Sequence, residues 1–315
     1  DGVGLTTLFS SLADDGKDLE KEMKEKLKRF GGAKKPKPGL AMQLKELLLF
    51  VGLCFYGVAK ITLFQPDSPS PFKAPISGKK RTAYTDRLSL DEITKVGKYT
   101  DSSNTVNDIL STIIAGALRM YCQEAGLQPD SMGVRCVMPV NIRPPHIIPK
   151  LENQFSIWYK SLPIHIPSGV GRLSNFHQRM SYMKKGIEAM LGTFLVKLIA
   201  FFPRWLFHAI INHYTRRGSC VTTNVPGPAD PVRFCGAPVD NVVFWVPSCG
   251  SVCLGISFFT YRGRVTIGVI SDANGADPHR LVDCIHKEWE ALKAEVATLK
   301  IKETPPTARR QDASS

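Results

Sequence analysis

Two polar motifs hold the side chains in this chain that could contribute directly to chemistry. Asn107-Asp108 stands at the start of a periodic apolar run, and Asn224 stands just before Val225-Pro226. Amides and carboxylates orient hydrogen-bond partners, whereas a serine nucleophile of the elbow type needs a Gly-x-Ser-x-Gly turn. No such turn occurs in the sequence. The absence of this turn argues against a Ser or Cys nucleophile.

Histidines and cysteines form no catalytic or metal-binding pattern. The seven histidines lie at 146, 165, 177, 208, 213, 279 and 286. The eight cysteines lie at 54, 122, 136, 220, 235, 249, 253 and 284, without a Cys-x-x-Cys pair. We therefore predict no metal site, and reduced cysteines that serve as small apolar side chains.

The carboxylate of Asp108 has two interpretations. Thr105-x-x-Asp108 has the spacing of a capping box, in which Thr105 caps a helix and Asp108 reaches back to the cap. Asn107 and Asp108 then either stabilise the helix start alone or also shape an active site by fixing that start.

The elements that position these residues follow from apolar periodicity. Apolar side chains repeat every 3.6 residues from Val106 to Tyr121, which predicts a helix beginning at Thr105. Arg262-Gly263 predicts a hairpin turn, and Asp277-Pro278 predicts the start of a closing helix that ends near Val296. Other helices are predicted at 1–12, 89–98 and 173–190, and strands at 134–140, 154–159, 220–224, 239–246, 252–261 and 264–271.

Helices and strands are mixed without regular alternation, which favours an α+β sandwich with a mixed sheet. The 315 residues suffice for one large domain or two smaller ones. Charged residues over 14–38 and prolines over 65–80 predict linkers.

The formal net charge of +13 favours an anionic partner. The basic residues are not interleaved with aromatic ones, and no nucleic-acid-binding motif is present, so we predict no nucleic acid. Apolar stretches at 47–59 and 191–211 are too short or too interrupted to span a bilayer. We expect them to lie on an anionic membrane surface, and residues 1–12 carry no signal-peptide pattern. These features favour a cytoplasmic protein that is peripheral to a membrane, either the endoplasmic reticulum or the plasma membrane.

Five sequence blocks, in consistent order, resemble the wax ester synthase/diacylglycerol acyltransferase family of the CoA-dependent acyltransferase superfamily. The blocks are Asp1-Gly2-Val3-Gly4, Thr105-Val106-Asn107-Asp108, Met138-Pro139-Val140-Asn141-Ile142-Arg143, Asn153-Gln154-Phe155-Ser156 and Thr222-Thr223-Asn224-Val225-Pro226-Gly227-Pro228. The resemblance extends over about residues 1–300.

The resemblance implies the fold of chloramphenicol acetyltransferase, in which two α/β subdomains meet along a tunnel. It implies that residues 1–80 are the remnant of an N-terminal subdomain with charged and Pro-rich linkers. Residues 81–300 would form the C-terminal subdomain and 301–315 a disordered tail. The N-terminal part of the fold would then be missing.

The resemblance also implies that a histidine is the general base. In the family motif His-His-x-x-x-Asp-Gly, the histidine takes the proton of an acceptor hydroxyl. Asp1-Gly2 resembles the end of this motif, and none of the seven histidines is followed by Asp-Gly at that spacing. We therefore expect the base upstream of Asp1 and no turnover by the chain alone. Asp1 would brace the histidine loop, and Gly2 would leave room at the tunnel wall.

Three further residues are candidates for the acyl channel. A buried Asn224 amide would bond a crossing strand. Gly250 and Gly255 would set the width of the channel, since glycine permits close approach, or they would only allow tight strand packing.

The function implied is transfer of a fatty acyl group from acyl-CoA to a long-chain alcohol or diacylglycerol, in wax ester or triacylglycerol synthesis. Acyl-CoA would be a co-substrate, and no permanently bound cofactor is expected. Two alternatives remain open: a non-catalytic lipid- or membrane-binding relative, and a different acyl or peptidyl transfer on the same scaffold. The sequence does not indicate the acceptor or the acyl chain length.

Overall fold

A computed structural model describes residues 2–14, 51–52, 55, 66–141, 143, 154–185, 203–247 and 250–303. Asp1, the tail from residue 304 and most of the apolar stretches at 47–59 and 191–211 lie outside these residues. The same holds for most of the charged linker at 14–38.

The core of the fold is a mixed seven-stranded sheet with the order β1-β9-β8-β5-β3-β4, in which β2 also pairs with β9. β5 lies parallel to β3 and to β8, and the remaining pairs are antiparallel. A separate two-stranded sheet pairs β6 with β7. The strands are β1 (Lys80–Tyr84), β2 (Leu88–Ser89), β3 (Val134–Asn141), β4 (Phe155–Leu162), β5 (Cys220–Pro226), β6 (Arg233–Phe234), β7 (Ala237–Pro238), β8 (Leu254–Tyr261) and β9 (Arg264–Asp272).

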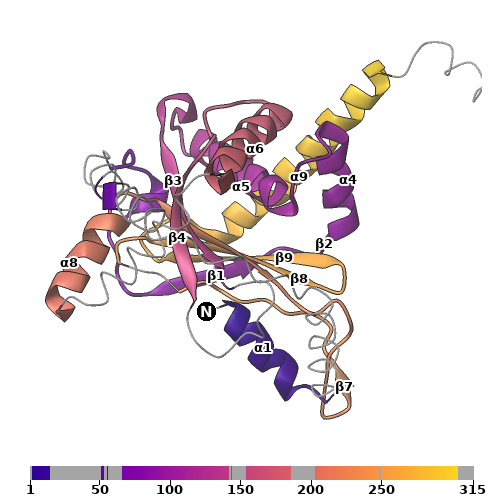
Figure 1. The fold of residues 1–315 in the computed structure, drawn as a ribbon. Coiled ribbons are helices and arrows are strands. Elements are labelled where there is room, and N and C mark those ends of the chain that lie inside the picture. The colour runs from indigo at the N-terminus through magenta and orange to yellow at the C-terminus, as the bar shows by residue number, and fades with distance from the viewer. Residues whose placement is uncertain are drawn as a thin grey trace, which may run out of the picture.

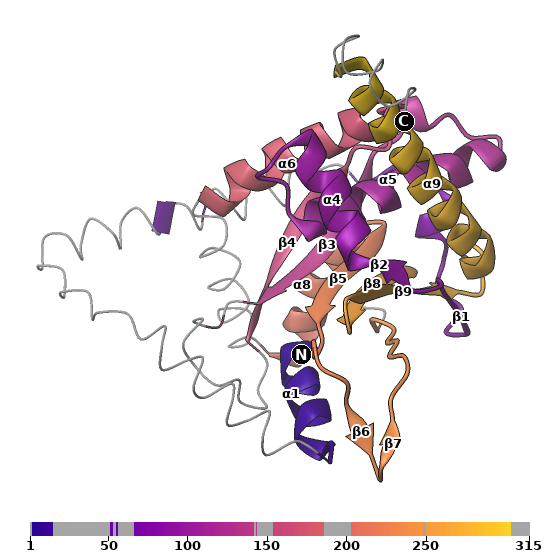
Figure 2. The ribbon, with the colours of Figure 1, turned by 90° about the vertical axis from the view of Figure 1, so that its right-hand side faces the viewer.

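Helices cover the sheet unequally (Figures 1 and 2). Four of them, α4, α5, α6 and α9, gather on one side, and α1 lies on the other side against β5. The helices are α1 (Gly2–Leu12), α4 (Leu90–Thr100), α5 (Val106–Glu124), α6 (Gly169–Lys185), α8 (Arg204–Thr215) and α9 (Pro278–Glu303), with short 3-10 turns at Pro71–Lys73 and Pro129–Ser131.

Helix α5 is the centre of the helical layer, as its sequence predicts. Ile109, Ile113, Ile114 and Leu118 are fully or almost fully buried and belong to the main core. Thr105 and Asp108 form the predicted capping box at its start. Because the apolar face and the cap both depend on residues that are near in sequence, the sequence alone predicts this helix and its start.

Two other predicted boundaries are confirmed by the backbone. Arg262 and Gly263 have positive φ angles of 50° and 69° between β8 and β9, as a tight hairpin with two left-handed residues requires. Asp277 accepts a hydrogen bond from the His279 amide at 2.9 Å and caps α9, which continues past Val296 to Glu303.

The strand predicted at Val239–Val246 is wrong. This segment has no strand pairing, and it runs over a face of the sheet instead of along its edge. The Phe244 carbonyl accepts a hydrogen bond from the Ser257 hydroxyl of β8, and a Cβ on Gly268 of β9 would lie 2.5 Å from the same oxygen. A segment above a sheet cannot join its hydrogen-bond ladder, although its apolar side chains imitate a strand.

Asp272 ties the end of β9 to the segment that leads into β1. Its buried carboxylate accepts hydrogen bonds from the amide and hydroxyl of Ser77 at 2.9 and 2.7 Å. It also accepts from the amides of Gly78 and Asn274 and from Lys80 Nζ at 3.0, 3.2 and 3.2 Å. Burial acts to raise the pKa of Asp272, but these donors outweigh it and hold the pKa well below its usual range.

This lowered pKa predicts an acid-sensitive stability. The contribution of Asp272 is complete above its unfolded pKa of about 3.9 and is lost as the pH falls toward its folded pKa. We expect the free energy of unfolding, measured with urea, to decline as the pH falls below about 4. D272N should be less stable near neutral pH and should decline less steeply in acid. Equal slopes for the two proteins would contradict the assignment.

The described cysteines are free, and five of the six are buried. Burial raises the pKa of Cys122, Cys136 and Cys284 to about 11, so these side chains remain thiols at neutral pH. None of the helices in the described part of the chain is both long enough and apolar enough to cross a membrane.

Candidate functional site

The start of α1 and the end of β5 bring together two of the predicted motif segments. Gly2 is the first residue of α1, and its Cα faces Val225. A Cβ at Gly2 would lie 2.5 Å from Val225 Cγ2, which is closer than side chains approach. Val225 therefore leaves room for a glycine at residue 2 but not for a larger side chain.

Asn224 does not occupy the buried position that was predicted for it. Alternate residues of a strand share a face, so Asn224 lies on the same face as Cys220 and Thr222, which are buried under the helical layer. Asn224 itself is exposed, because this end of β5 extends beyond the helices that cover its start. Val225 faces the other way and packs in the cluster beneath the sheet.

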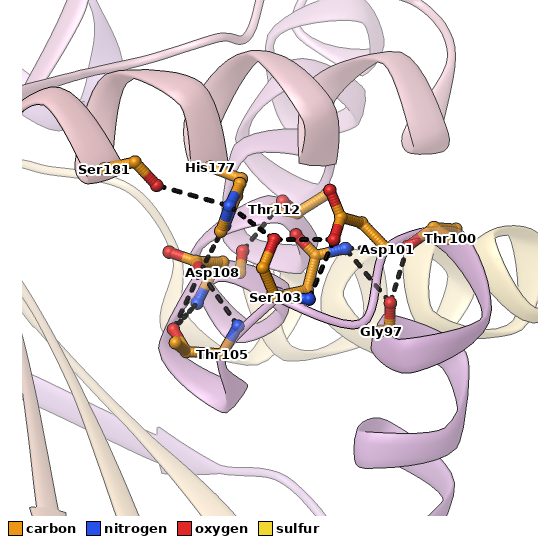
Figure 3. A network of polar contacts seen from close by, with 10 residues as sticks. Gly97, Thr100, Asp101, Ser103, Thr105, Asp108, Thr112, His177 and Ser181 are labelled. Atoms are coloured by element: carbon orange, nitrogen blue, oxygen red, sulfur yellow. Dashed lines mark hydrogen bonds and ion pairs between the residues drawn. The ribbon is translucent and has the colours of Figure 1, made fainter.

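Asp108 is the centre of a polar network between α5 and α6 (Figure 3). Its side chain is fully buried, and Oδ2 accepts hydrogen bonds from the amide and hydroxyl of Thr105 at 2.9 and 2.8 Å. His177 of α6 places Nδ1 3.0 Å from the same oxygen. The cap of α5 is therefore also the contact that joins it to α6.

The far side of the His177 ring is also held. Nε2 lies 3.1 Å from Ser103 Oγ and 3.2 Å from Ser181 Oγ. Ser103 donates to Asp101 Oδ1 at 2.6 Å, and the hydrogen bonds from Ser103 lower the pKa of Asp101. Because both ring nitrogens have protein partners, His177 acts as a brace between helices.

Sequence reasoning identified Asp108 but missed His177. The partners are 69 residues apart, and a single histidine on an amphipathic helix gives no signal of its own. Asn107 is half-buried and takes no part in this network. The structure thus gives Asp108 a confirmed structural role, while its predicted active-site role stays a prediction.

The two candidate channel glycines have different surroundings. Gly250 has a φ of +56°, and a Cβ there would collide with Thr215 at the end of α8. It lines a hollow of about 430 Å³ that also contains Lys73 and Arg216. A Cβ on Gly255 would lie 2.7 Å from Val246 and 2.8 Å from Ile270, so this glycine permits tight packing over the sheet.

These sites remain separate in the described parts of the chain. Among the described residues, no hydrogen bond or ion pair connects the Asp108 network with Gly2, Asn224 or Gly250. Nor do the residues described here include three or more His, Cys, Asp or Glu side chains placed to hold a metal ion.

Comparison with known proteins supports the family resemblance. Residues 151–293 match the family model of the WS/DGAT C-terminal domain. This match confirms the family resemblance predicted from the five sequence blocks, and it includes the block at residues 222–228.

Relatives in three organisms have names that agree with this match. A probable diacylglycerol O-acyltransferase of Mycobacterium tuberculosis is 24% identical over 207 residues, 64% of this chain and 44% of that protein. The O-acyltransferase WSD of Acinetobacter baylyi is 23% identical, over 78% of this chain and 55% of that protein. Wax ester synthase/diacylglycerol acyltransferase 6 of Arabidopsis thaliana is 26% identical, over 75% and 52%. The chain spans about half the length of these curated relatives.

Solved structures confirm the predicted fold class. The wax ester synthase/diacylglycerol acyltransferase from Marinobacter aquaeolei VT8 is similar with a TM-score of 0.56 and 20% identity, over 83% of this chain and 58% of that chain. The epimerization domain from the third module of tyrocidine synthetase B is similar with a TM-score of 0.52 and 13% identity, over 94% and 67%. At these identities the similarity establishes the α+β fold alone.

Proposed function

We propose that the protein is an O-acyltransferase, because residues 151–293 match the family model of the WS/DGAT C-terminal domain. In this proposal it moves a fatty acyl group from acyl-CoA to the hydroxyl of a long-chain alcohol or diacylglycerol. The relatives named above as diacylglycerol O-acyltransferases and wax ester synthases support this class of reaction.

The contact between Gly2 and Val225 is the observation that carries the proposal. It joins two of the blocks that resemble the family, although more than two hundred residues separate them. The resemblance implies that the catalytic histidine lies in the same motif as Asp1-Gly2, a few residues upstream of Asp1. Packing of Gly2 against β5 would hold that histidine loop at a fixed place on this subdomain.

The proposed reaction needs one base and no metal. The histidine accepts the proton of the acceptor hydroxyl, and the oxygen forms a bond to the thioester carbonyl carbon. The resulting tetrahedral intermediate collapses, the carbon–sulfur bond breaks, and the thiolate of coenzyme A takes the proton from the histidine. Asp108 acts at a distance in this proposal, because its network fixes the start of α5.

We also propose that the protein works at a membrane surface on the cytoplasmic side, where its lipophilic substrates reside. The net charge of +13 and the 72% exposed side chain of Trp205 on α8 support this placement. Flotation with anionic vesicles should show binding that weakens at high salt. Failure to bind at low salt would contradict it.

Release of coenzyme A tests the proposed reaction. The natural gene product that contains residues 1–315 should release coenzyme A from palmitoyl-CoA when hexadecanol or diacylglycerol is added, and a wax ester or triacylglycerol should form. Binding of these lipids without release of coenzyme A would favour the lipid-binding alternative. Transfer to an amine only would favour the other alternative, a different acyl or peptidyl transfer on the same scaffold.

Substitution of Gly2 should reduce turnover. In G2A the new methyl group would collide with Val225, so α1 must shift on β5. A displacement near 1 Å at a catalytic loop costs about 10²-fold in rate. V225A provides space for the methyl group, so G2A/V225A should recover most of the activity. If the double variant were as slow as G2A, the contact would not position the site.

A further inference from the structure

The hollow beside Gly250 has the composition of an anion site. Its volume is about 430 Å³, and its lining combines two cationic side chains with polar groups: Lys73, Arg216, Asn212 and Ser251, together with Ala74, Pro75, Ile76 and Gly250. This lining is mixed, but an acyl chain offers no partner to the two cations, so Lys73 and Arg216 favour an anionic occupant over the acyl channel predicted for Gly250.

Three segments that are distant in sequence build the hollow. Lys73 is the last residue of the 3-10 turn before β1, Arg216 follows α8, and Ser251 precedes β8. The Ser251 amide donates to Thr215 Oγ1 at 3.1 Å, and the two hydroxyls are 3.2 Å apart. The absence of a side chain at Gly250 allows this contact, so the wall is fixed to the end of α8.

Among the charges of the described residues that act on the pKa of Lys73, two are positive, Arg135 and Arg217, and one is negative, Asp67. Asp67 is buried, and its carboxylate already accepts from the Arg135 amide at 2.7 Å and from Ser219 Oγ at 2.7 Å. Arg135 Nη1 also lies 3.3 Å from Oδ1, the other oxygen of the Asp67 carboxylate. The Asp67 carboxylate is thus already engaged by other donors.

Lys73 experiences this excess directly. Burial lowers the pKa of Lys73, Asp67 opposes this effect, and Arg135 and Arg217 add to it. Its Nζ has only a long contact of 3.4 Å to the Asp67 carbonyl oxygen among the hydrogen bonds of the described residues. A bound anion would stabilise the ammonium group in place of the water that burial removes.

From this geometry we propose that the hollow binds a phosphate group, held by Lys73 and Arg216 with Asn212 and Ser251 as additional hydrogen-bond partners. Arginine and lysine are the side chains that proteins use most for phosphate recognition. Coenzyme A and anionic phospholipids both carry phosphate groups. Naming coenzyme A as the source rests on the proposed function, whereas phosphate binding itself does not.

Direct binding measurements test the proposal on the whole chain of residues 1–315. Calorimetry with coenzyme A, dephospho-coenzyme A and inorganic pyrophosphate, and flotation with phosphatidic acid vesicles, separate the sources. K73M/R216Q should weaken binding of the preferred ligand by at least about tenfold, since charge-assisted contacts are lost. K73R/R216K, which keeps both charges, should retain most of the binding.

A matched control removes the same charge elsewhere. K98Q/R179Q neutralises two exposed cations on α4 and α6 and should leave binding within about twofold. Equal weakening in the two double variants would overturn the site, because only net charge would then matter. Absence of binding of all four probes to the unaltered chain would overturn it as well.

The outcomes also separate this site from the proposed reaction. Phosphate binding without transfer activity in the natural gene product would support the phosphate site and contradict the proposed acyltransferase function. The opposite outcome is transfer activity with an unchanged KM for acyl-CoA in K73M/R216Q and no direct binding of any probe. It would support the proposed function and contradict the phosphate site.

Discussion

Replacing Glu288 by alanine is expected to lower the free energy of unfolding by about 3–5 kcal/mol, because it leaves the Arg172 guanidinium buried without its partner. Glu288 of α9 and Arg172 of α6 form an ion pair in which both side chains are almost fully buried. Burial raises the pKa of Glu288, although Arg172 opposes this, so the carboxylate is stabilised mainly by its partner. Urea unfolding at neutral pH measures the effect.

Gly116 of α5 completes this junction of three helices. A Cβ there would collide with the Glu288 carboxylate, so G116A should lose about 1–3 kcal/mol through overpacking. The control for charge is R172M/E288L, in which both charges are replaced by apolar groups. That variant should unfold within about 1 kcal/mol of the unaltered protein, since paired replacement of a buried ion pair is often neutral. A cost below 1 kcal/mol for E288A would contradict the burial of Arg172.

Replacing Asp108 by alanine should cost about 3 kcal/mol, more than a helix cap alone. A lost cap costs about 1 kcal/mol. Loss of the buried hydrogen bond between His177 and the Asp108 carboxylate adds about 2 kcal/mol to this cost. Thr105 and His177 both bind Oδ2 of Asp108, so one substitution removes both hydrogen bonds.

Two variants separate these contributions. H177A keeps the Thr105 cap and should cost about 2 kcal/mol, so it should be less damaging than D108A. D101N changes an exposed carboxylate of the same network and should cost much less than H177A, because solvent screens an exposed group. If D108A and H177A cost the same, the cap contributes nothing. Loss of turnover in D108A at an unchanged melting temperature would instead place Asp108 in the active site.

Local features of the fold could be predicted from sequence, and contacts between distant segments could not. The cap at Thr105, the turn at Arg262-Gly263 and the start of α9 depend on residues within one helical turn or one hairpin. The register of β5 against β8 and the pairing of Asp108 with His177 depend on chain segments tens of residues apart. No local sequence pattern shows which of these distant segments come into contact.

The two failed predictions have the same physical origin. Val239–Val246 has the composition of a strand, but it lies over the sheet, and composition does not distinguish a paired backbone from one that crosses above. The sequence predicts a buried Asn224 amide that bonds a crossing strand, but Asn224 is exposed because the helical layer ends before it. Burial depends on which elements cover a strand.

The pairing of β1 with β9 has a consequence for how the protein is made. Lys80 and Asp272, which face each other in this ladder, are 192 residues apart. At ribosomal speeds of about 5–20 residues per second, β1 waits about 10–40 s for its partner to be synthesised. During that time both β1 and β8 have an unpaired edge, which is the surface that strands of other chains recognise. We therefore expect the nascent chain to be most prone to aggregation just before β9 emerges, and the sheet to close only after nearly the whole of its sequence has left the ribosome.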